Sequence, residues 1–313
     1  MTWSTVIRQW SFDPSVVVPV VVVAVLYLRG AWGTFRRINV VGSSRANTRK
    51  GQAVAFGLGL IVVLLALESP IDYLSAYLFW PHMIQHLLLI MVAGPLLVLG
   101  DPSVPMLRGL PLGLRRQSLP AILRQRWIHA VGRAIARINT PIAAFSIFMV
   151  DLYLWHWNWL FVKALQNQSI HDLEHFCFLT TALLFWSQVV DQRPVHAKLS
   201  YLQRAFYVVF SGAAGNVLAM YFVFAPRALY APYVQITPRP FGMTALADQQ
   251  LAGAIMWIPV LFLFGGAFAI FLYKWLGSDD PATTTPVTAT SSYSVLLNPG
   301  ERAKDPYEAG LSV

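Results

Sequence analysis

Two pairs of histidines in apolar stretches are the residues best placed to do chemistry in this sequence. His82 and His86 stand in WPHMIQHLLLIMVAGPLLVLG, and His171 and His175 stand in HDLEHFCFLTTALLFW. Residues four apart on a helix lie one turn apart on the same face, so each pair presents two imidazoles together. Ionisable groups are costly on membrane helices and usually mark a site inside the bundle. The two pairs therefore predict one shared site for a metal ion or a cofactor.

The identity of the metal is less constrained than its ligands. Imidazole binds copper, zinc, iron and nickel, and nearby carboxylates can complete the ligand set or orient the imidazoles. Cys177 is the only cysteine, which excludes an internal disulfide and a cage of several thiolates. Met83 and Met256 are among the methionines that could offer a thioether to Cu(I), although methionine in a membrane helix is more often packing. The residue types alone leave copper and zinc equally favoured.

The elements that must position these residues are typical of a polytopic helical membrane protein. The 313 residues are 56% hydrophobic and 12% charged. Apolar runs predict an all-α fold, a bundle of seven transmembrane helices within one domain of residues 1–276. Gly94 and Pro95 are expected to break the third span. The predicted spans cover about residues 14–29, 52–67, 81–99, 141–159, 171–190, 204–225 and 250–275.

The Lys and Arg residues predict the orientation of the bundle. Most of them follow the first, third and fifth spans, and positive charge stays on the cytoplasmic side. The N-terminus is therefore expected outside and the C-terminus in the cytoplasm. This bias accounts for the net charge of +9 without a nucleic-acid partner.

Two cytoplasmic segments have their own character. Near residues 112–138, arginines alternate with apolar residues at roughly helical spacing, which predicts a basic amphipathic helix on the membrane lipids of the inner leaflet. Residues 277–313 are rich in Ser, Thr and Pro and are expected to form a disordered cytoplasmic tail.

With this topology, polar residues from several spans meet at the outer end of the bundle. The third and fifth spans begin outside with their histidine pairs, and the fourth span ends outside at His156. His156 is therefore the fifth candidate metal ligand. The residues expected to orient or support the imidazoles at this end are Gln85, Glu174, Asp72, Asp248, Gln249 and Met256.

Three other functions fit some of the same residues. Histidines on two facing helices could be the axial ligands of haem in an electron-transfer protein, although each i,i+4 neighbour crowds the porphyrin. His171, Glu174 and His175 form H-x-x-E-H, which resembles the motif of a zinc-dependent hydrolase, but no nucleophile motif accompanies it. A copper transporter would need ligands deeper in the bundle, and the inner half offers no comparable series.

The order of the motifs resembles a known family. SPIDYLSAYLFWPHMIQHLLLIMVAGPLLVLGDP, then HW, then HDLEHFCFLTTALLFW, then DQQLAGAIMWIP is similar to the CtaG-type (caa3-type) cytochrome c oxidase assembly factors, from about the second span to the seventh. The motif positions of that family fall here on His82, Gln85, His86, His156, His171, Glu174, His175, Asp248 and Gln249.

The resemblance implies a multi-pass protein of the bacterial plasma membrane that serves the maturation of haem–copper oxidases and is not an enzyme. Copper handling is the usual proposal for the family, and copper is the expected cargo, with zinc or haem as alternatives. The expected partners are oxidase subunits, above all the copper-bearing subunit II, and a copper chaperone as donor. Because the dicopper centre of the oxidase matures on the outer side, the metal site is expected to face the extracytoplasmic side.

Overall fold

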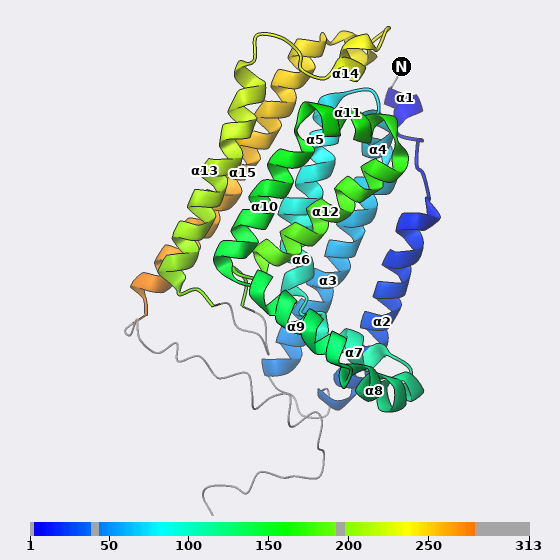
Figure 1. Cartoon of the computed structure of the whole chain (residues 1–313), viewed down its shortest axis with the longest axis vertical. Helices are drawn as coiled ribbons and strands as arrows, with labels where there is room; N and C mark the ends of the chain where they lie inside the picture. Colours follow the sequence, from blue (N-terminus) through cyan, green and yellow to red (C-terminus); the bar gives the residue numbers. More distant parts are fainter. Residues whose placement is uncertain (1–2, 39–43, 192–197, 279–313) are drawn as a thin grey trace, which may run out of the picture. The chain divides into compact units, whose positions relative to one another are not determined.

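The computed structural model describes residues 3–38, 44–191 and 198–278, and every regular element in these residues is a helix, which confirms the predicted all-α class (Figure 1). Helices lie over all seven predicted spans: α2 (Pro14–Ile38), α3 (Ser44–Glu68), α5 (Phe79–Leu87) continued by η1 (Leu88–Ala93) and α6 (Gly94–Leu99), α10 (Pro141–Trp155), α12 (Gln168–Trp186), α13 (Tyr201–Phe224) and α15 (Ala245–Leu276). The shorter helices are α1 (Trp3–Val6), α4 (Pro70–Ser75), α7 (Ser103–Gly109), η2 (Leu114–Ser118), α8 (Leu119–Leu123), α9 (Arg126–Ile138), α11 (Asn158–Gln166), α14 (Ala231–Gln235) and η3 (Pro240–Gly242).

Several of these helices are long and apolar enough to cross a membrane, as in a multi-pass membrane protein. Within the described residues the five that meet this criterion are Pro14–Trp32, Thr48–Ser75, Phe79–Leu99, Tyr201–Phe224 and Ala245–Leu276. α9 and α10 add at most a sixth, because they are bent by 83° at their junction. The two remaining predicted spans, α10 and α12, are 15 and 19 residues long, and α12 has ionisable residues in its first turns. The count of seven spans and the orientation stay predictions.

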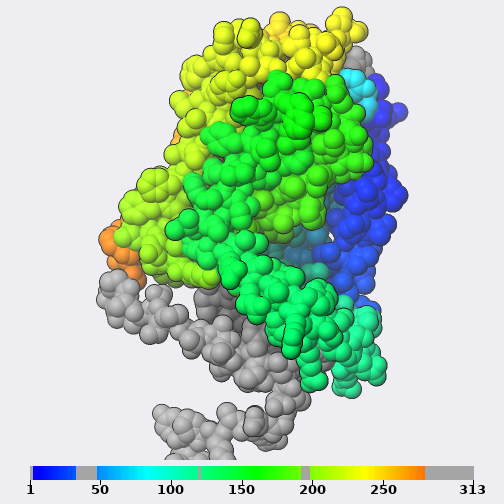
Figure 2. All heavy atoms as spheres, in the orientation of Figure 1, coloured from blue at the N-terminus to red at the C-terminus, as the bar shows by residue number. Residues whose placement is uncertain are grey.

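The two ends of the helix bundle carry different short helices. α1, α4, α11 and α14 lie at the end where α5 and α12 begin, whereas α7, α8 and α9 lie at the opposite end (Figure 1). In the space-filling view the green atoms of α10, α11 and α12 form a continuous surface, and the yellow segment around α14 lies above it (Figure 2). The start of α5 is enclosed, with Phe79, Pro81 and His82 buried, whereas Gln168 and Ser169 at the start of α12 are exposed.

The start of α5 is capped from another helix. α5 begins at Phe79, and its N-cap residue, Leu78, provides no side-chain hydrogen bond. Instead, the carboxylate of Asp248, in the first turn of α15, accepts hydrogen bonds from the backbone N–H groups of Phe79 and Trp80, both at 3.0 Å. The first N–H groups of a helix have no partner within it, so this carboxylate satisfies two of them. α15 thereby fixes the start of the helix that carries the first histidine pair.

The third span continues through Gly94 and Pro95, so the prediction of a break at this point was wrong. The chain widens instead into the π-helical turn η1, in which the N–H of Gly94 bonds to the carbonyl of Leu89. The carbonyl of Ile90 is left facing Pro95, which has no N–H to donate. The indole N–H of Trp186 on α12 donates to that carbonyl at 2.8 Å. The widened turn therefore also joins the two helices that carry the histidine pairs.

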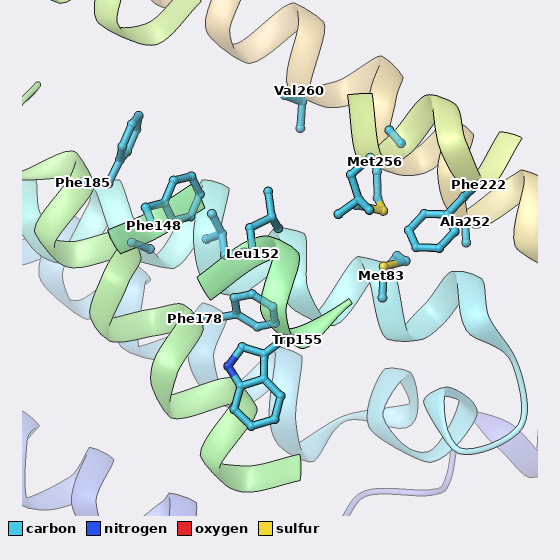
Figure 3. Close-up of a cluster of buried hydrophobic side chains, with 14 of the residues drawn as sticks. Met83, Phe148, Leu152, Trp155, Phe178, Phe185, Phe222, Ala252, Met256 and Val260 are labelled. Carbon is cyan, nitrogen blue, oxygen red and sulfur yellow. The ribbon is translucent and has the colours of Figure 1, made fainter. Parts of the chain in front are cut away.

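Below the histidines the bundle is filled by aromatic side chains. Phe148, Phe178, Phe185 and Phe222 are at most 2% exposed and belong to one core cluster between α10, α12 and α13 (Figure 3). α10 and α12 are also joined by a hydrogen bond from Thr181 Oγ1 to Asp151 Oδ2 at 2.8 Å. These contacts hold α12 in place beside α5 and α10.

The placement of the two predicted cytoplasmic segments relative to a membrane stays a prediction. Residues 126–138 form α9, on which Trp127, Val131 and Ile135 are exposed at intervals of four residues, as expected for an apolar stripe. Of the predicted tail, residues 279–313 lie outside the described part of the chain.

Candidate metal site

All five predicted ligands lie in one buried region at the start of α5 and α12. His82 and His86 come from α5, His171 and His175 from α12, and His156 is the C-cap residue directly after α10. Their exposed fractions run from 0% for His82 to 9% for His171. The ring centroids of His82 and His171 are 5.1 Å apart, and those of His86 and His175 are 5.4 Å apart. The two pairs therefore face each other across the α5–α12 contact, as their spacing predicted.

Two overlapping groups of these side chains have ligand atoms close enough to share one ion. His82, His171 and His175 form the first group, and all three ligand atoms lie within 4.8 Å of one another. His82, His86 and Glu174 form the second group by the same measure. His82 belongs to both groups, so the cluster can hold an ion at either of two adjacent positions. His156 is beside the cluster, with its ring centroid 5.8 Å from that of His86.

Glu174 lies among the imidazoles rather than behind them. Its side chain is 0% exposed, and its oxygens lie 3.8 Å from Nε2 of His82 and 3.7 Å from Nε2 of His86. These distances are too long for hydrogen bonds. An isolated buried carboxylate is costly unless a positive charge or donors compensate it. The position of Glu174 fits a direct ligand, in addition to the supporting role expected from the sequence.

The protonation of His82 is set by a tyrosine. Nδ1 of His82 lies 3.0 Å from the hydroxyl oxygen of Tyr233, and that hydroxyl donates to the carbonyl of Ser75 at 2.7 Å. Burial raises the pKa of Tyr233 well above its ordinary value, so the phenol keeps its proton. Because the hydroxyl hydrogen is already used, the phenol oxygen must accept from Nδ1–H of His82. The lone pair of His82 is then on Nε2, which points into the cluster.

Unpaired buried atoms concentrate in this cluster. In the described part of the chain, seven of the buried polar side-chain atoms without a hydrogen-bond partner belong to the four paired histidines and Glu174. They are His82 Nε2, His86 Nδ1, His86 Nε2, His171 Nε2, His175 Nε2 and both carboxylate oxygens of Glu174. Buried polar atoms are nearly always paired, and because one of the two His86 nitrogens carries a hydrogen, up to six of these atoms can offer a lone pair to a metal ion. The donor set, imidazole nitrogen with one carboxylate, fits copper or zinc.

Asp248 supports the cluster indirectly. One of its oxygens accepts from Arg239 at 2.7 Å, and Arg239 also donates to the backbone carbonyl of Tyr233. Asp248 thus holds both the start of α5 and the segment that carries Tyr233. Among the described residues its hydrogen bonds go to Arg239 and to the backbone of Phe79 and Trp80 and not to an imidazole, so its support acts through these groups.

The other supporting residues also bond to the scaffold rather than to imidazoles. Gln85 donates to Asp72 Oδ1 at 2.7 Å, which joins α5 to α4. Gln249 accepts from the N–H of Leu229 at 2.8 Å and donates to the carbonyl of Phe222 at 3.3 Å. Met256 lines a cavity that it shares with His86 and His156. Gln85, Asp72 and Gln249 thus position helices and loops around the site, whereas Met256 lines the cavity beside the histidines.

Tyr233, Arg239 and Phe161 are site residues that the sequence analysis missed. Phe161 of α11 is fully buried, with its ring centroid 5.0 Å from that of His82. All three lie in connections between the predicted spans. Aromatic residues in such connections usually indicate a position at the membrane interface, and the sequence around these three gives no sign of contact with a histidine. Pro232 near the start of APYVQ is the only signal of a helix at α14.

Comparison with known proteins identifies the family of the chain. The family model for the cytochrome c oxidase caa3 assembly factor matches residues 25–278. Uncharacterized proteins of Mycobacterium bovis and Mycobacterium tuberculosis are each 26% identical over 270 residues, which is 84% of this chain and 39% of the relative. An uncharacterized protein of Mycobacterium leprae is 24% identical over 278 residues, 86% of this chain and 40% of the relative. The chain thus spans about two fifths of the length of these curated relatives.

No solved structure matches the chain. The family match covers every candidate ligand, from His82 in α5 to His175 in α12, together with Asp248 in α15. On this evidence the chain belongs to the family of cytochrome c oxidase caa3 assembly factors.

Proposed function

We propose that this assembly factor binds copper between α5 and α12 and serves the maturation of a copper centre of the oxidase. The observation that carries the proposal is the group of seven unpaired nitrogen and oxygen atoms on His82, His86, His171, His175 and Glu174. Imidazole nitrogens suit copper, and a single carboxylate offsets the charge of a bound cation in a buried setting. Membership of an oxidase assembly family favours copper over zinc as the cargo.

The exposure of the cluster fits a cargo site that exchanges its ion. His171, in the first turns of α12, is the most exposed of the five histidines at 9%, whereas Glu174 is 0% exposed. We expect an ion to enter beside His171, and this entry requires the side chains around its buried Nε2 to move. A hydrolase that used Glu174 as its base would need water and substrate beside a carboxylate that is fully enclosed here. This burial favours binding over hydrolysis.

A single ion also fits the available space better than haem does. The cavity next to the cluster has a volume of about 40 Å³. Pockets that hold organic ligands usually measure roughly 300–1,000 Å³. A porphyrin would therefore require the helices around the histidines to separate, whereas we expect an ion to require only rotation of side chains.

We place the site on the extracytoplasmic side of the plasma membrane, because the arginine-rich connections, with Arg115, Arg116, Arg133 and Arg137, lie at the opposite end of the bundle. The partner that this location suits is the copper-bearing subunit II of the oxidase, with a copper chaperone as donor. The outcome in cells would be an oxidase that lacks its copper when the site is removed.

Elemental analysis of the purified protein tests the proposal, with wild type compared to His86→Ala and His175→Ala. His129→Ala is the matched control, because His129 is an exposed histidine on α9. Wild type and His129→Ala are expected to hold copper after copper-replete expression, and both cluster variants are expected to lose most of it. Wild type without copper would contradict the proposal, zinc in its place would favour the hydrolase, and an intense Soret band would favour haem.

A further inference from the structure

A contact between a histidine and a methionine lies beside the cluster. Nε2 of His156 is 3.4 Å from the sulfur of Met83, and the two residues are 6% and 0% exposed. Nδ1 of His156 lies 2.7 Å from the carbonyl oxygen of Leu152, which can only accept. In the neutral imidazole the proton is therefore on Nδ1, and Nε2 carries the lone pair.

Two lone pairs thus face each other in the buried contact. The thioether sulfur of Met83 has no proton to donate, and Nε2 of His156 has none in this tautomer. A doubly protonated His156 would supply one, but among the described residues no carboxylate pairs with His156 to compensate the buried charge. A cation that binds nitrogen and sulfur together satisfies both atoms.

The surroundings offer further soft ligands and little charge. The adjoining cavity of about 40 Å³ is lined by Met83, His86, His156 and Met256 and otherwise by apolar side chains, apart from Ser211. Met83 on α5 and Met256 on α15 lie across from each other, each with its sulfur toward the other side chain (Figure 3). The pair therefore lies at the edge of a small, mostly apolar cavity that Met256 also lines.

We propose that His156 Nε2 and Met83 Sδ form a second metal position, distinct from the imidazole–carboxylate cluster and suited to Cu(I). Thioether sulfur is a soft ligand and favours the soft cuprous ion. Imidazole and thioether are both neutral, so the position adds no negative charge, and burying a monovalent ion there costs less than burying a divalent one. This second position depends on the function proposed above in one respect, namely that the cargo is copper.

The separation of the two atoms agrees with a shared ion. With the distances of zinc to imidazole nitrogen and to cysteine thiolate as a guide, about 2.0 Å and about 2.3 Å, an ion shared by the two atoms would subtend an angle of roughly 105° at their separation of 3.4 Å. That angle is close to the tetrahedral value. Met256, which lines the same cavity, is the further soft side chain that we expect to join the coordination, while His86 stays with the imidazole–carboxylate cluster.

X-ray absorption at the copper edge tests the position in full-length protein loaded with Cu(I) under ascorbate. Wild type is expected to show a sulfur scatterer on copper. Met83→Leu, a change that nearly conserves volume, is expected to reduce the sulfur signal and to weaken Cu(I) binding at least tenfold, while zinc binding by the imidazole–carboxylate cluster is unchanged. Met220→Leu, at a residue that is 40% exposed on α13, is the control and is expected to match wild type.

The wild-type spectrum keeps the test valid even if Met83→Leu misfolds. Copper bound by nitrogen and oxygen alone in wild type would overturn the second position and leave the proposed function intact. An unchanged sulfur signal in folded Met83→Leu would also overturn it. Absence of copper from wild type altogether would overturn the proposed function as well.

Discussion

Nε2 of His82 lies 3.8 Å from a carboxylate oxygen of Glu174, and neither atom has a hydrogen-bond partner although both side chains are fully buried. A second imidazole, His86, lies on the other oxygen at 3.7 Å. The carboxylate therefore lies next to two imidazole nitrogens, both of which belong to α5. Glu174 is the residue whose role most clearly separates a metal site from a group of packed histidines.

Glu174→Gln is expected to weaken copper binding at least tenfold. The amide keeps the shape of the side chain but removes the negative charge that offsets the cation, and changes to residues around metal ligands commonly cost 10–100-fold in affinity. A competition titration with a copper chelator measures the effect. Asp172→Asn is the control, because it removes one carboxylate from α12 at a residue that bonds to Gln168 and lies outside the cluster. Equal affinity in the two variants would argue that Glu174 is not a ligand.

Tyr233→Phe is expected to lower copper affinity about 10–100-fold, because Nδ1–H of His82 then has no acceptor and the lone pair is no longer held on Nε2. The loss of stability is expected to stay near 1 kcal/mol, the usual net value of a hydrogen bond. Chelator competition and thermal unfolding in detergent separate the two effects. Tyr230→Phe provides the comparison, since the Tyr230 hydroxyl bonds to the backbone carbonyl of His156 at 2.8 Å and to no imidazole nitrogen. A smaller loss of affinity in Tyr233→Phe than in Tyr230→Phe would disprove the assigned tautomer.

Arg239→Met is expected to destabilise the protein by about 3 kcal/mol, because it leaves the buried Asp248 without its cation. Thermal unfolding in detergent is the measurement. The double variant Arg239→Met/Asp248→Asn is expected to lose less free energy of unfolding than the sum of the losses in the two single variants, since the residues act as one pair. Arg227→Met, an exposed arginine in the same connection, should unfold like wild type. Additive losses would show that Arg239 and Asp248 act independently.

Trp186→Phe is expected to cost about 1–3 kcal/mol, because the carbonyl of Ile90 is left buried without a donor. Pro95→Ala restores a backbone N–H next to that carbonyl, so in the Trp186→Phe background it is expected to recover part of the loss. A double-mutant cycle by thermal unfolding measures the recovery. Trp157→Phe, at a residue that is 70% exposed, controls for the loss of an indole. If Pro95→Ala destabilises both backgrounds equally, the hydrogen bond is not what Trp186 provides.

The sequence by itself determined which helices carry the candidate ligands and which faces those residues share. An i,i+4 pair of histidines lies on one helix face for geometric reasons that no neighbour can change. The cost of ionisable groups in an apolar setting then requires such faces to meet, and His82, His86, His171 and His175 do meet. The helical class followed from the long apolar runs in the same way.

Only the tertiary structure decided what surrounds the imidazoles. Asp248 and Arg239 reach the site through the start of α5 and the backbone of Tyr233, contacts between residues far apart in the chain that no local pattern encodes. The break expected at Gly94 and Pro95 was wrong because the lost backbone hydrogen bond was replaced from another helix, by Trp186. Local spacing sets the direction of a side chain along its own helix, whereas its hydrogen-bond partner depends on which helices pack together.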